Sequence, residues 1–280
     1  MIFGLGAAVS WGVADLLTAV VGRRMGSFVA LVAAQFSSAL VLAAIFLMVR
    51  PAVTATGSDL LIVAASGGVG AFGYIFVFRA LELGPVALVS PIVSSFGAIA
   101  VVLALVILKE ALPGLVLAGA AATLCGVVLA TFDPRRFRPE RQAGGIPLAL
   151  ATAGCFGLAA FLLGRGAQTA GWLVTLGVSR LATITVLAVP AIVARNRFRG
   201  MDRRALPAAA LIGLVDLLGV ALYSRGAELG LVSVVAATSA TFTLIPVVGG
   251  VVAFRERPAA SQWLGIAMVV GGLVMLGLGR

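Results

Sequence analysis

The stretch Arg79-Ala80-Leu81-Glu82-Leu83-Gly84 returns, slightly changed, as Arg225-Gly226-Ala227-Glu228-Leu229-Gly230. The two copies lie 146 positions apart, and the residues after them correspond without a gap: Phe96 with Phe242, Lys109-Glu110 with Arg255-Glu256, Gly119 with Gly265 and Gly126 with Gly272. In a chain rich in Val, Ala and Leu, apolar matches arise easily by chance, whereas matched Arg, Glu and Gly do not. The sequence therefore predicts one structural unit used twice.

The amino-acid composition is typical of an integral membrane protein. Hydrophobic residues make up 61% of the sequence and charged residues 11%, with a mean hydropathy of +1.17. An ordinary soluble domain is about 45–50% apolar and about 25% charged. The 35 glycines agree with a membrane protein, because membrane helices pack through small residues. We therefore expect a multi-pass protein of the cell membrane.

The apolar segments have the length of membrane-spanning helices, which need about 20 residues. Ten are expected, at 2–22, 27–49, 60–80, 85–107, 112–132, 146–165, 171–194, 205–225, 231–254 and 261–279. The expected fold class is thus an all-α integral membrane protein with ten transmembrane helices. It divides into a first five-helix repeat (1–132), a basic interhalf loop (133–145) and a second five-helix repeat (146–280). The alternating ten-residue strands of a β-barrel are absent from the sequence.

An odd number of helices in each repeat has a topological consequence. The second copy must enter the membrane from the face opposite to the first, so the two halves are predicted to be inverted repeats. Secondary transporters are commonly built in this way, and they bind their solute near the bilayer midplane between the repeats.

The basic residues are divided unequally between the two predicted faces. Of the 20 Lys and Arg residues, Arg180 lies within a segment and 14 lie in or beside the connections that follow odd-numbered helices. The other five are on the side of the termini: Arg50, Lys109, Arg165, Arg225 and Arg280. Because basic loops stay in the cytoplasm, both termini are expected to face outward. Since the charges sit in short gaps and form no stripe, we expect no nucleic-acid partner.

Several kinds of chemistry are excluded or disfavoured. The chain has no histidine, which removes Ser-His and Cys-His nucleophiles and histidine-ligated metal sites. The two cysteines, Cys125 and Cys155, fall in apolar runs and are interpreted as packing residues. No Gly-rich phosphate loop ending in Lys-Ser/Thr is present, so energy must come from a gradient and no cofactor or metal is expected.

Three ionisable residues stand clearly inside the predicted segments, Asp15, Arg180 and Asp216, and Gln35 is a fourth polar candidate. With a rise of about 1.5 Å per residue, they lie about 14–20 Å from one face of a core about 30 Å thick. An ionisable residue at that depth indicates a functional site. We expect a polar layer around a central cavity, in which Arg180 meets an anionic solute group or pairs with Asp15 or Asp216. A buried ion pair that only fixes helix packing is the alternative.

Further residues are candidates for the cavity or for helix contacts. Ser94, Thr238 and Thr241 lie in the middle of the fourth and ninth segments, where they either line the cavity or bond back to their own helices. A stripe of small residues predicts close helix packing in the fifth segment, with a partial counterpart in the tenth: Ala118, Ala122 and Gly126, then Ala267 and Gly271. Two pairs spaced i, i+3 are expected to form ion pairs at helix ends: Arg79 with Glu82 and Arg225 with Glu228.

Three features together point to a known family: Trp11-Gly12 with Asp15 in the first segment, the stretch from Arg79 to Pro85, and the acidic segment ends Glu110 and Glu256. In these features and in its repeat, the chain resembles the EamA-type members of the drug/metabolite transporter superfamily. The resemblance implies ten helices, an inverted repeat and a central cavity for solutes such as amino acids and other metabolites, often exported. Familiar members have both termini inside, which departs from the charge distribution here.

We therefore expect a secondary-active transporter of a small metabolite, amino acid-like or another small organic solute, working as an exporter by alternating access. Its partners would be the solute and the lipid bilayer, and it would act as a monomer or a homodimer. A membrane channel or a non-transporting scaffold is the alternative. An intramembrane enzyme is disfavoured, because without histidine only isolated carboxylates remain as bases.

Overall fold

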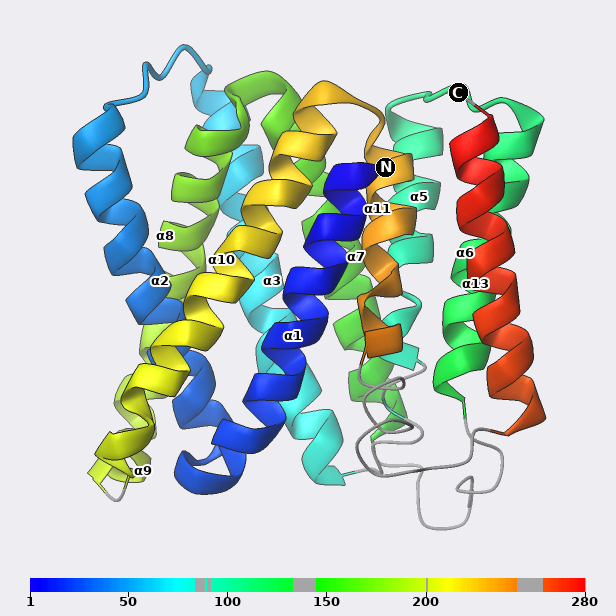
Figure 1. Ribbon diagram of the computed structural model, residues 1–280. Helices are drawn as coiled ribbons and strands as arrows, with labels where there is room; N and C mark the ends of the chain where they lie inside the picture. Colours follow the sequence, from blue (N-terminus) through cyan, green and yellow to red (C-terminus); the bar gives the residue numbers. More distant parts are fainter. Residues whose placement is uncertain (84–88, 90–91, 133–144, 200, 246–258, 280) are drawn as a thin grey trace.

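The computed structural model describes residues 1–83, 89, 92–132, 145–199, 201–245 and 259–279. Throughout these ranges the regular structure is helical, with no strand. The helices are α1 (Ile2–Met25), α2 (Ser27–Val49), α3 (Gly57–Leu83), α5 (Phe96–Ile107), α6 (Gly114–Thr131), α7 (Ile146–Ala170), α8 (Trp172–Val193), α9 (Arg195–Arg199), η2 (Arg203–Ala205), α10 (Leu206–Leu229), α11 (Val232–Ser239), η3 (Ala240–Thr243) and α13 (Ala260–Leu278). Figure 1 shows the long helices side by side, with both chain ends on one side of the molecule.

Within the described ranges, seven helices are long and apolar enough to cross a membrane. They are Ile2–Met25, Ser27–Val49, Gly57–Ala80, Gly114–Thr131, Ile146–Ala170, Trp172–Val193 and Arg203–Leu229. Three shorter apolar helices cover the remaining expected segments in part: Ile92–Ile107, Val232–Thr243 and Ala260–Leu276. Apart from Gly145, the predicted interhalf loop lies outside the described residues.

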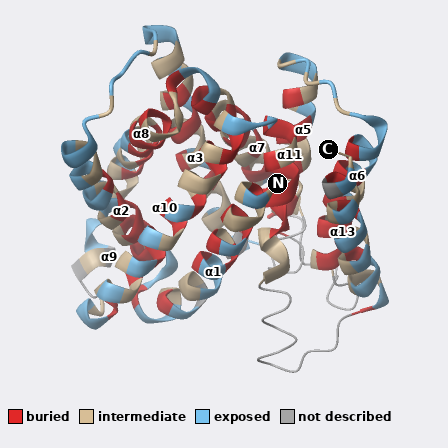
Figure 2. Ribbon diagram, turned by 45° about the horizontal axis from the view of Figure 1, so that its top comes forward, coloured by how far each residue is buried: buried red, intermediate tan, exposed pale blue. Residues whose placement is uncertain are grey.

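The contacts between helices repeat when the two halves are exchanged. Helix α1 packs against α10, and its counterpart α7 packs against α3. In the same way α2 contacts α10 while α8 contacts α3, and α11 contacts α1 while α5 contacts α7. Each half therefore completes its packing with helices of the other half. Buried residues gather where these helices meet, and exposed residues cover the outer faces (Figure 2).

Equivalent glycines end the first helix of each half. Gly26 separates α1 from α2 with φ 85°, and Gly171 separates α7 from α8 with φ 80°. Only glycine adopts such positive φ angles at little cost, so one residue suffices to join two long helices. The two positions lie 145 residues apart, which agrees with the repeat seen in the sequence.

Helices α6 and α13, at the right of Figure 1, form an antiparallel pair through their glycines. A Cβ atom on Gly119 would stand 2.8 Å from the Gly272 carbonyl oxygen, and one on Gly126 would stand 2.7 Å from that of Gly265. These two contacts are equivalent, because Gly119 corresponds to Gly265 and Gly126 to Gly272. The backbones can approach this closely only because all four residues lack a side chain.

The predicted stripe of small residues was therefore on the wrong face of its helix for two of three members. Ala118 is exposed and Ala122 only half-buried, whereas Gly119, Thr123 and Gly126 are buried against α13. In the tenth segment, Ala267 and Gly271 are exposed. The physical reason is that neighbouring residues differ by about 100° around an α-helix, and these helices are apolar on all sides.

Candidate solute-binding cavity

Three of the four predicted polar residues meet in the interior. The Arg180 guanidinium on α8 donates to Asp216 Oδ2 on α10 at 3.0 Å. The Gln35 side chain on α2 donates through Nε2 to the same oxygen at 3.4 Å. All three residues are buried, with 6%, 9% and 2% of their surface exposed for Arg180, Asp216 and Gln35. Of the two carboxylates expected at this depth, the one that pairs with Arg180 is thus Asp216.

Close backbone contacts place these side chains. A Cβ atom on Gly213 would overlap the Ala34 carbonyl oxygen, so α10 lies directly on α2 beside Gln35. The equivalent Gly67 on α3 approaches the Ser179 carbonyl oxygen just as closely, beside Arg180. Gln35 and Arg180 are thus held by matching contacts in the two halves.

Asp216, which accepts both hydrogen bonds in this polar cluster, has no polar counterpart in the other repeat. Asp216 corresponds in the repeat to Gly70, which has no side chain. The symmetrical frame therefore carries an asymmetric charge pattern, with one guanidinium and one amide around a single carboxylate.

The polar cluster borders a cavity of about 560 Å³ between the two halves. Asp15 of α1 lines it together with Gln35, Arg180, Asp216 and the predicted Ser94. Aromatic side chains line it as well: Trp11, Tyr74, Phe78, Phe96, Phe156 and Phe242. The lining combines a few polar groups with apolar and aromatic walls, as sites for small organic molecules do.

Two predicted lining residues lie elsewhere. Thr238 and Thr241 are buried and donate to the carbonyl oxygens of their own helix, Thr238 to Val234 at 2.8 Å and Thr241 to Thr238 at 2.7 Å. Thr238 also packs against Gly4 of α1. Both threonines thus take the back-bonding alternative rather than a place on the cavity wall.

For the aromatic walls the sequence offers one signal, which is the repeat itself. Phe96 and Phe242 marked the repeat, and their rings lie 5.9 Å apart between centroids. Phe242 meets Trp11 edge-on at 6.2 Å, and Phe96 meets Phe156 edge-on at 6.4 Å. Trp11 and Phe156 are also equivalent in the repeat, but the change of residue type concealed the match.

On the side of the termini, the interior above the cavity is packed. Tyr223 is fully buried, contacts Trp11 at 5.8 Å and donates its hydroxyl to the Ala160 carbonyl oxygen at 3.0 Å. By contrast, Tyr74 contacts Phe156 at 5.2 Å, is only half-buried and lines the cavity. Tyr223 therefore belongs to the packed interior, whereas Tyr74 borders the cavity.

Carboxylates join helix ends on the same side. Glu110 accepts the backbone N–H groups of Val232 at 2.8 Å and Ser233 at 3.0 Å, together with the Ser233 hydroxyl. This places a negative charge on the N-terminus of α11 and ties the first half to the second. Glu228 likewise accepts the N–H of Trp172, the first residue of α8, at 3.3 Å.

Of the predicted end-of-helix ion pairs, Arg225 with Glu228 is confirmed. The Glu82 side chain, the predicted partner of Arg79, lies outside the described residues, as do Arg255 and Glu256.

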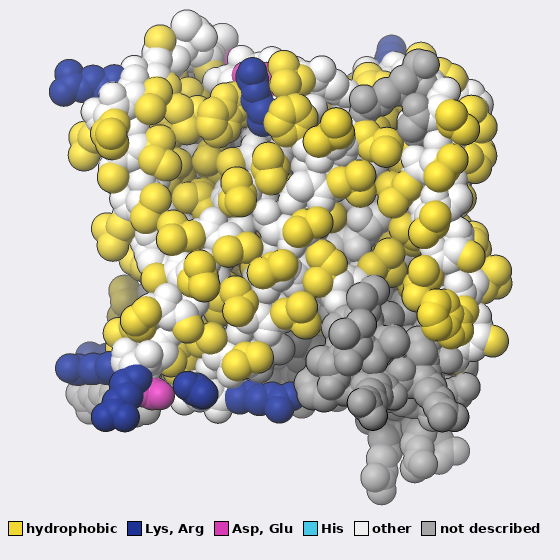
Figure 3. Space-filling model, in the orientation of Figure 1, with side chains coloured by type: hydrophobic (Ala, Val, Ile, Leu, Met, Phe, Trp, Pro, Cys, Tyr) yellow, Lys and Arg dark blue, Asp and Glu magenta, His cyan; other side chains and the backbone are white. Residues whose placement is uncertain are grey.

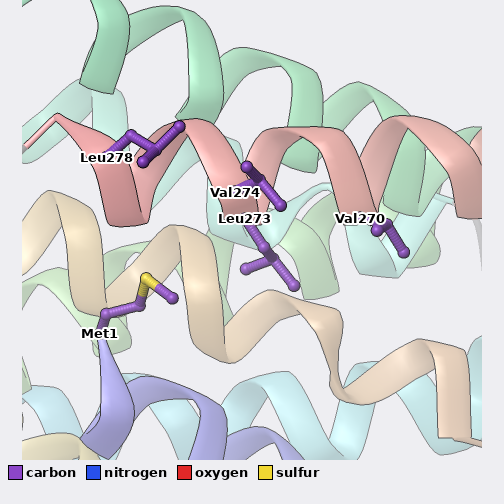
Figure 4. A pocket seen from close by; sticks show the side chains of 5 residues that line it. All are labelled: Met1, Val270, Leu273, Val274 and Leu278. Carbon is purple, nitrogen blue, oxygen red and sulfur yellow. The ribbon is translucent and has the colours of Figure 1, made fainter.

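A second hollow lies between Met1 and the outer face of α13. Its lining side chains, Met1, Val270, Leu273, Val274 and Leu278, are all apolar (Figure 4). It offers no polar side chain to orient a solute, so we place the candidate site in the central cavity.

The surface shows the two boundaries expected of a membrane protein. In Figure 3 hydrophobic side chains cover the middle of the molecule, and Lys and Arg gather along the lower edge, away from the termini. Exposed basic residues of that edge are Arg23, Arg24, Arg195, Arg203 and Arg204. The seven long apolar helices identify a multi-pass integral membrane protein.

Comparisons with known proteins agree with this architecture. The EamA-like transporter family matches twice, over residues 1–132 and 143–278. Among solved structures 29 chains match. One crystal structure of a protein shares 22% sequence identity and superposes with a TM-score of 0.76, covering 100% of this chain and 97% of that one. At that identity the likeness shows the fold alone.

No curated protein matches the chain. The family matches, however, include 132 and 136 residues, which together form nearly the whole sequence. Both fall on the two halves that exchange their helix contacts around the cavity. This protein, built from two such repeats, belongs to the EamA-like transporter family.

Proposed function

We propose that the protein is a secondary-active transporter of a small organic solute, amino acid-like or of similar size, and that it exports this solute by alternating access. The observation that carries the proposal is the central cavity, which lies between equivalent helices of the two halves and is lined by a few polar groups and by aromatic side chains. Asp15, Gln35, Ser94, Arg180 and Asp216 are the proposed binding residues. The partners are the solute and the bilayer, and the protein acts as a monomer or a homodimer.

The membrane arrangement is part of the same proposal. The three shorter apolar helices complete ten spans, five in each half, and the halves are inverted about an axis in the membrane plane. The antiparallel pairing of the equivalent helices α6 and α13 supports this inversion. The protein resides in the cell membrane with both termini outside, because the basic edge lies away from them.

Counterflow in proteoliposomes tests the transport function. Vesicles loaded with unlabelled solute should accumulate the labelled compound transiently, with a panel that covers amino acids, sugars and cationic drugs. A channel would equilibrate the label without accumulation, and a scaffold would behave like protein-free vesicles. Either result would refute the proposal.

A pair of phenylalanine variants links the flux to the cavity. Phe156 lines the cavity, whereas Phe72 is 48% exposed on the outer face of α3. Phe156→Ala should reduce the counterflow rate at least about tenfold, as expected when a packed binding wall is removed. Phe72→Ala should leave it within about twofold of the wild type.

A further inference from the structure

The charges that face the cavity do not balance. Arg180 is compensated by Asp216, with which it forms a direct ion pair at 3.0 Å. Asp15 also lines the cavity, and its side chain forms no hydrogen bond or ion pair with any described residue. It lies close enough to Asp216 for the two carboxylates to repel each other. The Asp15 side chain is exposed where it lines the cavity, so a positively charged occupant can reach its carboxylate and offset the unpaired negative charge.

The neutral polar groups add hydrogen-bond acceptors to the lining. Thr18, Ser66, Ser179 and Thr183 each donate their hydroxyl proton to a backbone carbonyl oxygen. A hydroxyl has a single proton to donate, so these side chains can only accept hydrogen bonds from an occupant of the cavity. The lining therefore suits a group that donates several hydrogen bonds.

Gln35 supplies a second, independent indication. Its amide nitrogen faces Asp216, since the opposite amide orientation would set oxygen against carboxylate. Its other end, Oε1, is buried and accepts no hydrogen bond from any residue in the described part of the chain. A buried acceptor left unpaired is costly, and Gln35 borders the cavity, so a donor entering there would relieve it.

We propose, building on the proposed transport function, that the solute carries a protonated amine, which binds between Asp15 and Gln35. The aromatic walls formed by Trp11, Tyr74 and Phe156 then hold its apolar body, and the faces of these rings attract the cation. A free carboxylate on the solute is not required. The Arg180–Asp216 pair remains intact and holds Gln35 in position through the shared Oδ2 atom.

The test is equilibrium binding to the purified protein in nanodiscs, measured by calorimetry with three ligands of matched shape. They are 2-phenylethylamine, which is cationic, 2-phenylethanol, which is neutral, and 3-phenylpropanoate, which is anionic. An ion pair in a partly desolvated site should make the amine bind at least about tenfold more tightly than either of the others. Equal binding of the three, tighter binding of the acid, or no binding of the amine overturns the proposal.

Variants assign the preference to Asp15. Asp15→Asn should weaken amine binding at least about tenfold while leaving alcohol binding unchanged, and Asp15→Glu should retain the preference for the amine. Asp59→Asn, the same change at the exposed start of α3, should alter neither ligand. If Asp15→Asn does not fold, the amine preference is judged from the three ligands with the wild-type protein and from Asp15→Glu. An Asp15→Asn protein that keeps the full preference for the amine refutes this assignment.

Binding and flux are measured separately, so the two proposals fail separately. Saturable counterflow restricted to neutral or anionic solutes would overturn the amine assignment and leave the transporter standing. Selective amine binding without any counterflow would overturn the proposed transport function and leave the amine assignment in place.

Discussion

The rings of Phe96 and Phe242, which occupy the same position in the two repeats, lie 5.9 Å apart between centroids with planes inclined by 50°. Each ring also meets, at an interplanar angle of 82°, an aromatic residue from the first helix of the other repeat, Phe156 or Trp11. Beyond these four rings the surroundings differ, because Tyr223 is buried and Tyr74 lines the cavity. The two tyrosines are not equivalent in the repeat, which pairs Tyr74 with Val220 and Tyr223 with Val77, so the sequence itself makes the two ends of the cluster different.

The tyrosines allow this asymmetry to be tested by removing the same atom at both ends. Tyr223→Phe leaves the Ala160 carbonyl oxygen without its donor in the packed layer. Loss of this hydrogen bond should lower the free energy of unfolding by about 0.6 kcal/mol, the average for hydrogen bonds between membrane helices. Tyr74→Phe should leave stability unchanged and alter solute binding. Thermal unfolding in detergent measures the first effect, and equal destabilisation by both variants would contradict the assigned roles.

Adjacent glycines of α13 provide a matched test of the helix contact. A Cβ atom on Gly272 would stand 2.6 Å from the Gly119 carbonyl oxygen, whereas one on Gly271 would meet no atom within 4 Å. Both changes to alanine improve helix propensity equally, so the difference between them isolates the contact. Gly272→Ala should cost about 1–3 kcal/mol of stability, and Gly271→Ala should be neutral or slightly stabilising. Unfolding midpoints of the two proteins that do not differ would rule out close packing here.

How much of this could be read from the sequence depends on the physical quantity concerned. The level of a residue along its helix was predictable, because the rise per residue of a helix is fixed. Gln35, Arg180 and Asp216 do meet, and Asp15 lines the same cavity. The choice of Asp216 over Asp15 as the partner of Arg180 could not be made, since both lie at similar depth and only the helix packing separates them.

Rotation about the helix axis was not predictable. In most helices of this chain all faces are apolar, so no hydrophobic stripe tells which residue faces a neighbour. That is why the predicted stripe of Ala118 and Ala122 lies one residue away from the buried Gly119, and why the sequence left open whether Thr238 lines the cavity or bonds back to its own helix. Predicting the aromatic cluster would require the rotation of four helices about their axes, so the cluster is seen only in the structure.

Glu110 is predicted to hold the N-terminus of α11. Glu110→Ala removes a carboxylate that accepts two backbone N–H groups, and it should cost about 0.5–2 kcal/mol, as loss of a helix cap does. Hydrogen–deuterium exchange of the Val232 and Ser233 amides should then accelerate. Glu228→Ala, the same change at α8, should affect the Trp172 amide instead. Unchanged exchange at Ser233 would show that the contact does not stabilise the helix end.

Membrane orientation can be tested with reporters on the two sides. Both termini lie on the upper side of Figure 1, and α9, which shortly precedes the exposed Arg203 and Arg204 in the chain, lies at the lower edge. Because basic residues are retained in the cytoplasm, a reporter active only in the cytosol should be silent when fused after Arg280. The same reporter inserted after Asp202 should be active. The reverse pattern would place both termini inside, as in familiar members of the family.

The pair of Arg180 with Asp216 is predicted to serve transport and not only packing. Removing one partner of a buried ion pair typically costs about 3–5 kcal/mol, so Arg180→Gln and Asp216→Asn should each lower the unfolding midpoint strongly. The double variant should recover stability, because neither charge is then left unpaired. It should nevertheless not transport, since Gln35 loses the carboxylate that orients its amide.

The exposed pair of Arg225 with Glu228 is the control for this cycle. Its arginine side chain is 42% exposed, so Arg225→Gln should change stability by no more than about 1 kcal/mol and leave counterflow intact. If Arg180→Gln transports normally, the residue has no part in the cycle. If the double variant recovers both stability and transport, the pair is structural. A double variant that regains stability but does not transport would show that the ion pair takes part in transport. If the pair were purely structural, stability and transport would recover together.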